Sequence, residues 1–319
     1  MSYGIKIYPR NGKPYIFNEN TMFISVGKIG STPQNPTMIF DTGYKVPDGY
    51  DYVTVITRSF PSGQSPSSEM YASINGNGNV ELAIEGGVPR SNIWFWGVIY
   101  IILLIPQSRN TGSHGIEILG EKNRYMTLSD GAHVTSCLFR GETEVYTGWT
   151  PRIVYPDFDP NNDICFFYLE NTNYAILFLD NGNHEIRMFA RGTNQYNHGH
   201  RVNAKVVILG KAKLQPDSHG INIWAKNGDL VFTSSSIQAG TGGIKKISKI
   251  EGEKIGNMKK PMFIPATLGI YGSATYQLCN DNDLIVGVPL LWSQSGINNF
   301  KPTRGAHVFI DASDYFYFE

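Results

Sequence analysis

The sequence predicts an all-β protein that consists of three tandem β-sandwich-like modules packed closely together. Three observations predict this fold class. A short motif appears three times, at successive distances of 111 and 105 residues (115 − 4 and 220 − 115). Turn-forming residues recur about every ten residues, which is typical of β-sandwiches and small barrels. No long stretch shows the 3.6-residue hydrophobic period of an amphipathic helix, so βαβ units are not expected.

The recurring motif has the sequence Gly-Ile-x-Ile and begins at Gly4, Gly115 and Gly220. In an extended strand its two isoleucines lie on one face, and a second apolar run follows each motif after turn-forming residues. Each copy is therefore predicted to be a β-hairpin. The opening glycine is expected where a Cβ atom would clash or where φ is positive, and Asn-Gly pairs supply positive φ angles in turns. The turn residues are Asn11-Gly12, Asn123-Arg124 and Asn227-Gly228, and the second runs are Tyr15 to Phe17, Tyr125 to Leu128 and Leu230 to Phe232.

After this first hairpin, each module is expected to continue in the same order. A second hairpin turn rich in asparagine and aspartate follows, flanked by strand-like runs, and an apolar strand then closes the module. The turns are 75–79, 180–183 and 280–283; the flanking runs include 80–84, 174–179, 185–189 and 284–286; the closing strands are 98–103, 206–209 and 308–310.

The preserved order of these features predicts three domains, at residues 1–110, 111–215 and 216–319. The linkers between them, 107–112 and 215–217, are short, so the modules are expected to pack against one another rather than swing freely. The segment from Thr241 to Met262 has no regular pattern and contains two Lys-Lys pairs. It is predicted to be a solvated loop or a rim that contacts an acidic partner.

The charge balance limits the kinds of partner. The chain has 27 basic and 27 acidic side chains, which argues against nucleic acid or a membrane surface held by charge. A net charge near zero also removes the repulsion that keeps monomers apart, as suits an assembly. The start of the chain lacks the pattern of a secretory signal, and Cys137, Cys165 and Cys279 show no paired spacing. We therefore expect folding in a reducing cytoplasm, without disulfides.

One apolar segment, Ile93 to Ile105, could suggest a membrane contact. It is shorter than the ~20 residues that a spanning helix needs, and its β-branched and aromatic residues favour a strand buried on both faces. We predict a strand in the core or at a subunit interface and no stable membrane insertion.

Two segments resemble metal sites, but neither has a full ligand set. His198 and His200 would share one face of a strand, without an evident third ligand. The run from Asp157 to Asp163 imitates the start of a calcium loop but lacks its glycine, and Tyr168 stands where the bidentate glutamate should be. Polar loop residues and a turn with Asx hydrogen bonds are the favoured interpretations. No metal and no cofactor are predicted.

No motif for catalysis is present either. Gly76 and Gly78 belong to a hairpin turn without a following helix, so a phosphate cradle is not expected. His114 and His219 occupy the same repeat position, where the first copy has Tyr3, which favours packing or hydrogen bonding over catalysis. The protein is predicted not to be an enzyme, with a polysaccharide-degrading activity as the least favoured alternative. Five tryptophans could form a sugar platform, although core or interface positions are favoured: Trp94, Trp96, Trp149, Trp224 and Trp292.

The start of the chain carries a resemblance to a known group. The run Tyr3-Gly4-Ile5-Lys6-Ile7, followed by Asn11-Gly12 and Tyr15-Ile16-Phe17, resembles the opening of uncharacterised virion proteins of tailed bacteriophages. Those proteins often begin with Met, a small residue, Tyr-Gly and a short apolar strand, and are encoded among tail genes. They are commonly one or two modules long, so a chain of three modules departs from the pattern. The resemblance carries no catalytic residues.

Together these observations predict a structural component of a tailed-bacteriophage particle, in the tail tip, baseplate or fibre base, made in the host cytoplasm and located in the virion. The expected partners are other tail proteins, further copies in a symmetric ring, and a bacterial surface glycan or receptor. A carbohydrate-binding or receptor-binding module is the first alternative, and a head decoration protein is the second. The sequence assigns no individual binding residues.

Overall fold

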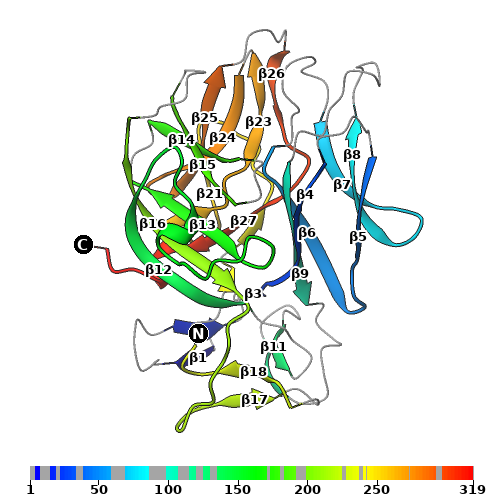
Figure 1. The fold of residues 1–319 in the computed structure, drawn as a ribbon, viewed down its shortest axis with the longest axis vertical. Helices are drawn as coiled ribbons and strands as arrows, with labels where there is room; N and C mark the ends of the chain where they lie inside the picture. Colours follow the sequence, from blue (N-terminus) through cyan, green and yellow to red (C-terminus); the bar gives the residue numbers. More distant parts are fainter. Residues whose placement is uncertain are drawn as a thin grey trace.

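The computed structural model is an all-β protein (Figure 1). Its described parts contain no α-helix and only two 3-10 helices, Pro151–Ile153 and Ala312–Asp314. The described residues are 4–7, 15–18, 22–33, 39–58, 69–85, 98–106, 115–119, 125–129, 135–170, 173–179, 183–191, 199–224, 228–236, 240–241, 243–272, 274–291 and 297–318.

The same three-stranded antiparallel arrangement occurs in each predicted module. In each module the closing strand lies between a strand that follows the first hairpin and a middle strand, so the predicted closing strands are confirmed. The three sets are β4 (Ser25–Ser31), β9 (Ile99–Pro106) and β6 (Tyr50–Ile56); β12 (Ser136–Val145), β16 (Val202–Gly210) and β13 (Ile164–Leu169); and β20 (Gly243–Lys245), β27 (His307–Asp311) and β22 (Pro261–Phe263). The second and third sets join into one six-stranded sheet, because Phe167 of β13 pairs with Phe263 of β22.

A second layer of strands completes each module. It contains the second hairpin of the module, as predicted: β7 with β8, β14 with β15, and β24 with β25. The strands of this layer are β5 (Ile39–Lys45), β7 (Glu69–Ile74) and β8 (Asn79–Glu85); β14 (Tyr174–Phe178) and β15 (Ile186–Ala190); and β21 (Glu253–Lys254), β23 (Thr267–Gly272), β24 (Ala274–Asp281), β25 (Leu284–Leu291) and β26 (Ile297–Pro302). In the first module the Asn75 amide donates to the Asn79 carbonyl across the turn, and Gly78 has φ +80°.

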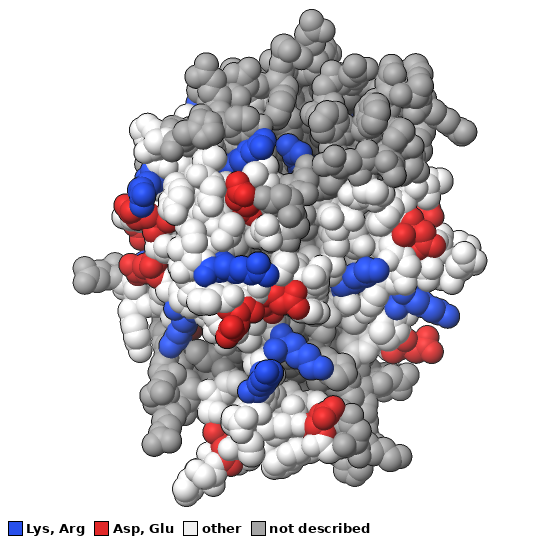
Figure 2. Space-filling view, viewed as in Figure 1, with Lys and Arg blue, Asp and Glu red and all other residues white. Residues whose placement is uncertain are grey.

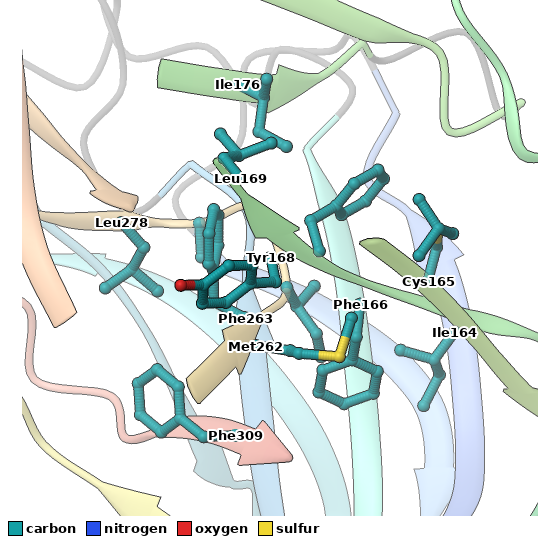
Figure 3. Packing of buried hydrophobic residues seen from close by; sticks show 14 of the residues in the cluster. Ile164, Cys165, Phe166, Tyr168, Leu169, Ile176, Met262, Phe263, Leu278 and Phe309 are labelled. Atoms are coloured by element: carbon teal, nitrogen blue, oxygen red, sulfur yellow. The ribbon is translucent and has the colours of Figure 1, made fainter. Parts of the chain in front are cut away.

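One hydrophobic core extends through all three modules. Figure 3 shows side chains of β13, β22 and β27 packed together in it. Strand β9 shows how the first module joins this core: Ile99, Ile101 and Leu103 belong to the shared core, whereas Tyr100 and Ile102 belong to a smaller core between the two sheets of the first module. The described part of the Ile93 to Ile105 segment is therefore buried on both faces, as expected, and serves both a module core and the contact between modules.

Hydrogen bonds also connect the modules. The Thr267 amide donates to the Thr57 carbonyl at 3.2 Å, which connects the third module to the first. The Arg304 amide donates to the carboxylate of Glu69, a side chain that is only 1% exposed. With the shared core, these bonds hold the three β-sandwich-like modules closely together. The boundaries 1–110, 111–215 and 216–319 stay predictions, since no measurement separates the modules.

The segment from Thr241 to Met262 differs from its predicted solvated loop. Ile247 and Ile255 are buried in the shared core, and β20 and β22 lie in the six-stranded sheet. The prediction is confirmed for exposed residues between the strands, such as Lys246 and Lys249, and is wrong for the buried residues and the strands. Isolated apolar residues, without a period, give no pattern in the sequence yet still anchor a segment. Lys245 forms an ion pair with Glu253 at 2.9 Å.

All three cysteines are free, as expected.

Candidate assembly surface

Three two-stranded hairpins lie at the same end of the molecule (Figure 1). They are β1 (Gly4–Ile7) with β2 (Tyr15–Asn18), β10 (Gly115–Leu119) with β11 (Tyr125–Ser129), and β17 (Asn222–Trp224) with β18 (Leu230–Thr233). All three are antiparallel, so the repeated Gly-Ile-x-Ile motif forms a hairpin in every copy, as the sequence predicts.

The strand register shows that the three hairpins are copies of one unit. Gly4 pairs with Asn18 and Gly115 pairs with Ser129, and both pairs are 14 residues apart (18 − 4 and 129 − 115). The third hairpin has a register shift between Ile223 and Trp224. Beyond this shift the registers agree again, because Leu119 pairs with Tyr125 and Trp224 pairs with Leu230, in both cases the fourth and tenth residues after the motif glycine.

The opening glycine of the third copy has both properties that the sequence suggests. Gly220 has φ +140°, and a Cβ atom there would lie 2.1 Å from the Ser234 Oγ. That hydroxyl accepts a hydrogen bond from the Ile221 amide at 3.1 Å. Gly228 has φ +87°, as expected for the turn. The other turn residues of the motif, Asn11-Gly12, Asn123-Arg124 and Asn227, lie outside the described residues.

Asp217 fixes the third hairpin to the segment that precedes it. Its Oδ2 atom accepts hydrogen bonds from Thr233 Oγ1 at 2.6 Å, Ser234 Oγ at 3.0 Å and the Ser235 amide at 2.7 Å. Desolvation raises the pKa of Asp217, but these donors outweigh it and hold the pKa below its ordinary value. Asp217 lies in a predicted linker, and nothing in the sequence marks it as an anchor.

We expect Asp217→Ala to loosen the third hairpin without unfolding the molecule. The three donors would then hydrogen-bond to water instead of a carboxylate. At this partly exposed site the change should destabilise the hairpin by about 1 kcal/mol. Hydrogen exchange of the amides in 222–224 and 230–233 should become faster, while exchange in β16 should not change. Asp157→Ala, at an exposed position outside the hairpin, is the control. Equal protection in the wild type and in Asp217→Ala would contradict the role of this carboxylate.

The third hairpin presents apolar side chains to solvent. Trp224 is 49% exposed and Ile221 is 37% exposed, whereas Val231 and Phe232 are buried. Of the two positions expected for the tryptophans, core or interface, the core is excluded for Trp224, and an interface position stays a prediction. The core position is confirmed for Trp149, which is 0% exposed. Trp94, Trp96 and Trp292 lie outside the described residues.

Two of the histidines considered as ligands or repeat residues, His200 and His219, belong to the described part of the chain, and each lies beside a hydroxyl group. His200 is exposed, and its Nδ1 atom lies 2.9 Å from the hydroxyl of Tyr174. His219 is exposed beside the Ser218 hydroxyl, at 3.1 Å. His198 and His114 lie outside the described residues. Within the described part of the chain, no three His, Cys, Asp or Glu side chains are placed to hold a metal ion.

The calcium-like segment is a turn held by Asx hydrogen bonds, the favoured interpretation. Asp159 accepts from the Asn161 amide at 3.0 Å and from the Asn162 side chain at 2.6 Å, and its own amide donates to Asp163 at 2.8 Å. The first two bonds help to hold the pKa of Asp159 below its ordinary value, whereas burial raises the pKa of Asp163 to about 6. Gly76 and Gly78 lie in the turn between β7 and β8, as predicted.

Two histidines that the sequence does not single out are buried in apolar surroundings. The ring of His184 packs against the rings of Phe158 and Phe178, with centroids 5.3 and 4.9 Å away. His307 lies in β27, where its Nε2 atom is 3.3 Å from the hydroxyl of Thr303. Desolvation lowers the pKa of each histidine to about 4.

We expect acid to destabilise the protein from pH 6.5 downward. The unfolded histidines take up protons near pH 6.5, but His184 and His307 do so in the folded state only near pH 4, so stability falls as the pH falls. Between pH 7 and pH 5 each histidine lowers the free energy of unfolding by about 2 kcal/mol. Asp163, whose pKa is raised in the folded state, increases it by about 1 kcal/mol over the same range. The net loss is about 2 to 3 kcal/mol.

Urea unfolding at a series of pH values measures this loss. His184→Asn should make the dependence of stability on pH shallower, because asparagine does not titrate and tolerates the positive φ of 52° at this position. A variant curve parallel to that of the wild type would contradict the assignment.

On the described part of the face drawn in Figure 2, the surface charges show no dominant sign. Figure 2 shows Lys and Arg interspersed with Asp and Glu over the described part of one face. Among the described residues, no helix has the length and apolar character needed to cross a membrane.

Comparison with known proteins gives a family match. The model of a family described as "Family of unknown function (DUF6453)" matches residues 4–282, which include all three hairpins. No curated protein and no solved structure matches the chain. The match covers more than half of the sequence, and the chain therefore belongs to the DUF6453 family.

Proposed function

We propose that the protein is a structural component of a tailed-bacteriophage particle, placed in the tail tip, baseplate or fibre base, and that it acts by assembly. The observation that carries the proposal is the triplicate hairpin: one chain presents three copies of the same unit at one end. Oligomeric assemblies are built on closed symmetry, and an internal threefold repetition suits a position on a three- or sixfold axis.

Two further observations support this role. The modules share one core and are hydrogen-bonded to one another, so the hairpins project from a single body. The opening of the first hairpin is the segment that resembles virion proteins of tailed phages. A structural protein acts through its shape and its contact surfaces rather than through a reactive centre. A degenerate repeat provides several similar contact surfaces in one chain.

Labelling of intact particles tests the proposal. Antibodies against this chain, bound to gold and viewed by negative-stain electron microscopy, should mark the tail end of the particle. Label on the head would favour the alternative of a head decoration protein. Particles labelled on neither tail nor head would end the proposal.

A carbohydrate-binding or receptor-binding role is the second candidate, and the exposed indole of Trp224 favours it. Aromatic rings with a free face can stack on sugars. A glycan array probed with the wild type and with Trp224→Ala would show binding that the substitution abolishes. Silence of the wild type on arrays and on host cells would count against this role. Release of fragments from host capsule or lipopolysaccharide would instead indicate a degrading enzyme.

A further inference from the structure

The three hairpins adjoin one junction where the modules meet. Twenty residues after the motif glycine, the chain reaches Ile24, Thr135 and Gly240 (4 + 20, 115 + 20 and 220 + 20). The Thr135 amide donates to the Ile24 carbonyl at 3.3 Å. Gly240, in β19 (Gly240–Thr241), pairs with Phe23, in β3 (Met22–Phe23). Three equivalent positions of the repeat therefore meet around residues 23 and 24.

Equivalent positions of a threefold repeat come together only near the axis that relates the copies. The junction thus marks an internal pseudo-threefold axis. The strands that follow agree with it, because β4, β12 and β20 begin shortly after the junction, and each is the outer strand of the same three-stranded arrangement. The hairpins precede the junction in each copy and are drawn at one end of the molecule (Figure 1). That end consequently presents a triplicated surface.

We propose that this end docks on the threefold axis of a homotrimeric partner, with one chain bound per trimer. The proposal rests on the proposed structural role and names the partner of its surface. A chain without an internal repeat can occupy only one of the three identical sites on a trimer. A chain with three similar hairpins engages all three, and each contact then gains from the effective concentration that the other two provide.

The chemistry of the third hairpin indicates the kind of contact. Trp224 in β17 and Ile221, just before this strand, are exposed, and a large aromatic side chain with an aliphatic neighbour is a frequent anchor at protein interfaces. Two-stranded sheets are marginally stable in water, and pairing with a further strand stabilises them. The partner surface should therefore offer apolar pockets or extended strands, one set per subunit, rather than a charged face.

Photo-crosslinking in assembled particles tests the docking. Benzoylphenylalanine is placed in separate chains at Ile5, Ile116 and Ile221, the first isoleucine of each motif copy. After irradiation of purified particles, mass spectrometry should find all three positions linked to the same segment of one polypeptide. Quantification with isotope-labelled peptides should give a ratio of one copy of this chain to three copies of that polypeptide. The matched control is Ile74, which is 46% exposed in β7 and should not link to that segment.

The possible outcomes distinguish the docking proposal from the proposed structural role on which it rests. If the chain is absent from purified particles, the structural role fails and the docking fails with it. If the chain is present but the three positions link to different polypeptides or to unrelated segments, only the docking on a homotrimer is overturned. An equimolar ratio of this chain to the crosslinked polypeptide would also overturn it.

Discussion

Replacement of Trp149 by alanine is expected to lower the free energy of unfolding by about 3 to 5 kcal/mol, because the change leaves a large cavity in the core. Trp149 is 0% exposed, and its ring packs edge-on against Phe167 with centroids 5.6 Å apart. Phe167 pairs with Phe263, so the loss reaches the junction between the second and third modules. Urea unfolding followed by circular dichroism measures the effect.

Trp224→Ala is the matched control, since the same side chain is removed from a site that is 49% exposed. Surface substitutions usually change stability by less than about 0.5 kcal/mol, and this one should fall near that range. If the two variants lost similar stability, the distinction between a core tryptophan and a surface tryptophan would be wrong. If Trp224→Ala remains stable but fails to enter particles, the result supports a role for this surface in assembly.

Asn280→Ala is expected to cost about 3 to 4 kcal/mol and to weaken the contact between the second and third modules. The Asn280 side chain is 1% exposed and bonds the Leu169 backbone twice, accepting from its amide and donating to its carbonyl, both at 2.7 Å. Without the side chain, both backbone groups are left buried and unsatisfied, and each costs about 1 to 3 kcal/mol. Urea unfolding and faster exchange of the Leu169 amide would record the loss.

Asn282→Gly serves as the control for this variant, because Asn282 is exposed, has φ +53° and lies in the turn that follows β24. Glycine accepts this backbone angle, so the change should be within about 0.5 kcal/mol. A variant Asn280→Ala as stable as Asn282→Gly would show that the double hydrogen bond to Leu169 contributes little. The sequence places both asparagines in one predicted turn, and only the structure separates the buried bridge from the exposed turn residue.

Much of the candidate surface could be predicted because hairpins are local. The motif at Gly4, Gly115 and Gly220 combines alternation with turn residues, and neighbouring segments of chain pair at little entropic cost. The anchor Asp217 could not be predicted, since it depends on hydroxyl groups that lie about 16 residues away in β18 and its turn. The exposure of Trp224 could not be predicted either, because alternation distinguishes the two faces of a strand but does not show which face is buried.

The sequence by itself determined the all-β class, the triplicate hairpin, the second hairpins and the closing strands, because each depends on periodicity or turn chemistry within a short segment. Only the tertiary structure decided how the modules join. The single pair Phe167 with Phe263, the Asn280 bridge to Leu169 and the meeting of Ile24 with Thr135 connect residues about 96 to 111 positions apart. Such contacts depend on which surfaces are buried against one another, and the free energy of that burial is shared among residues with no local pattern.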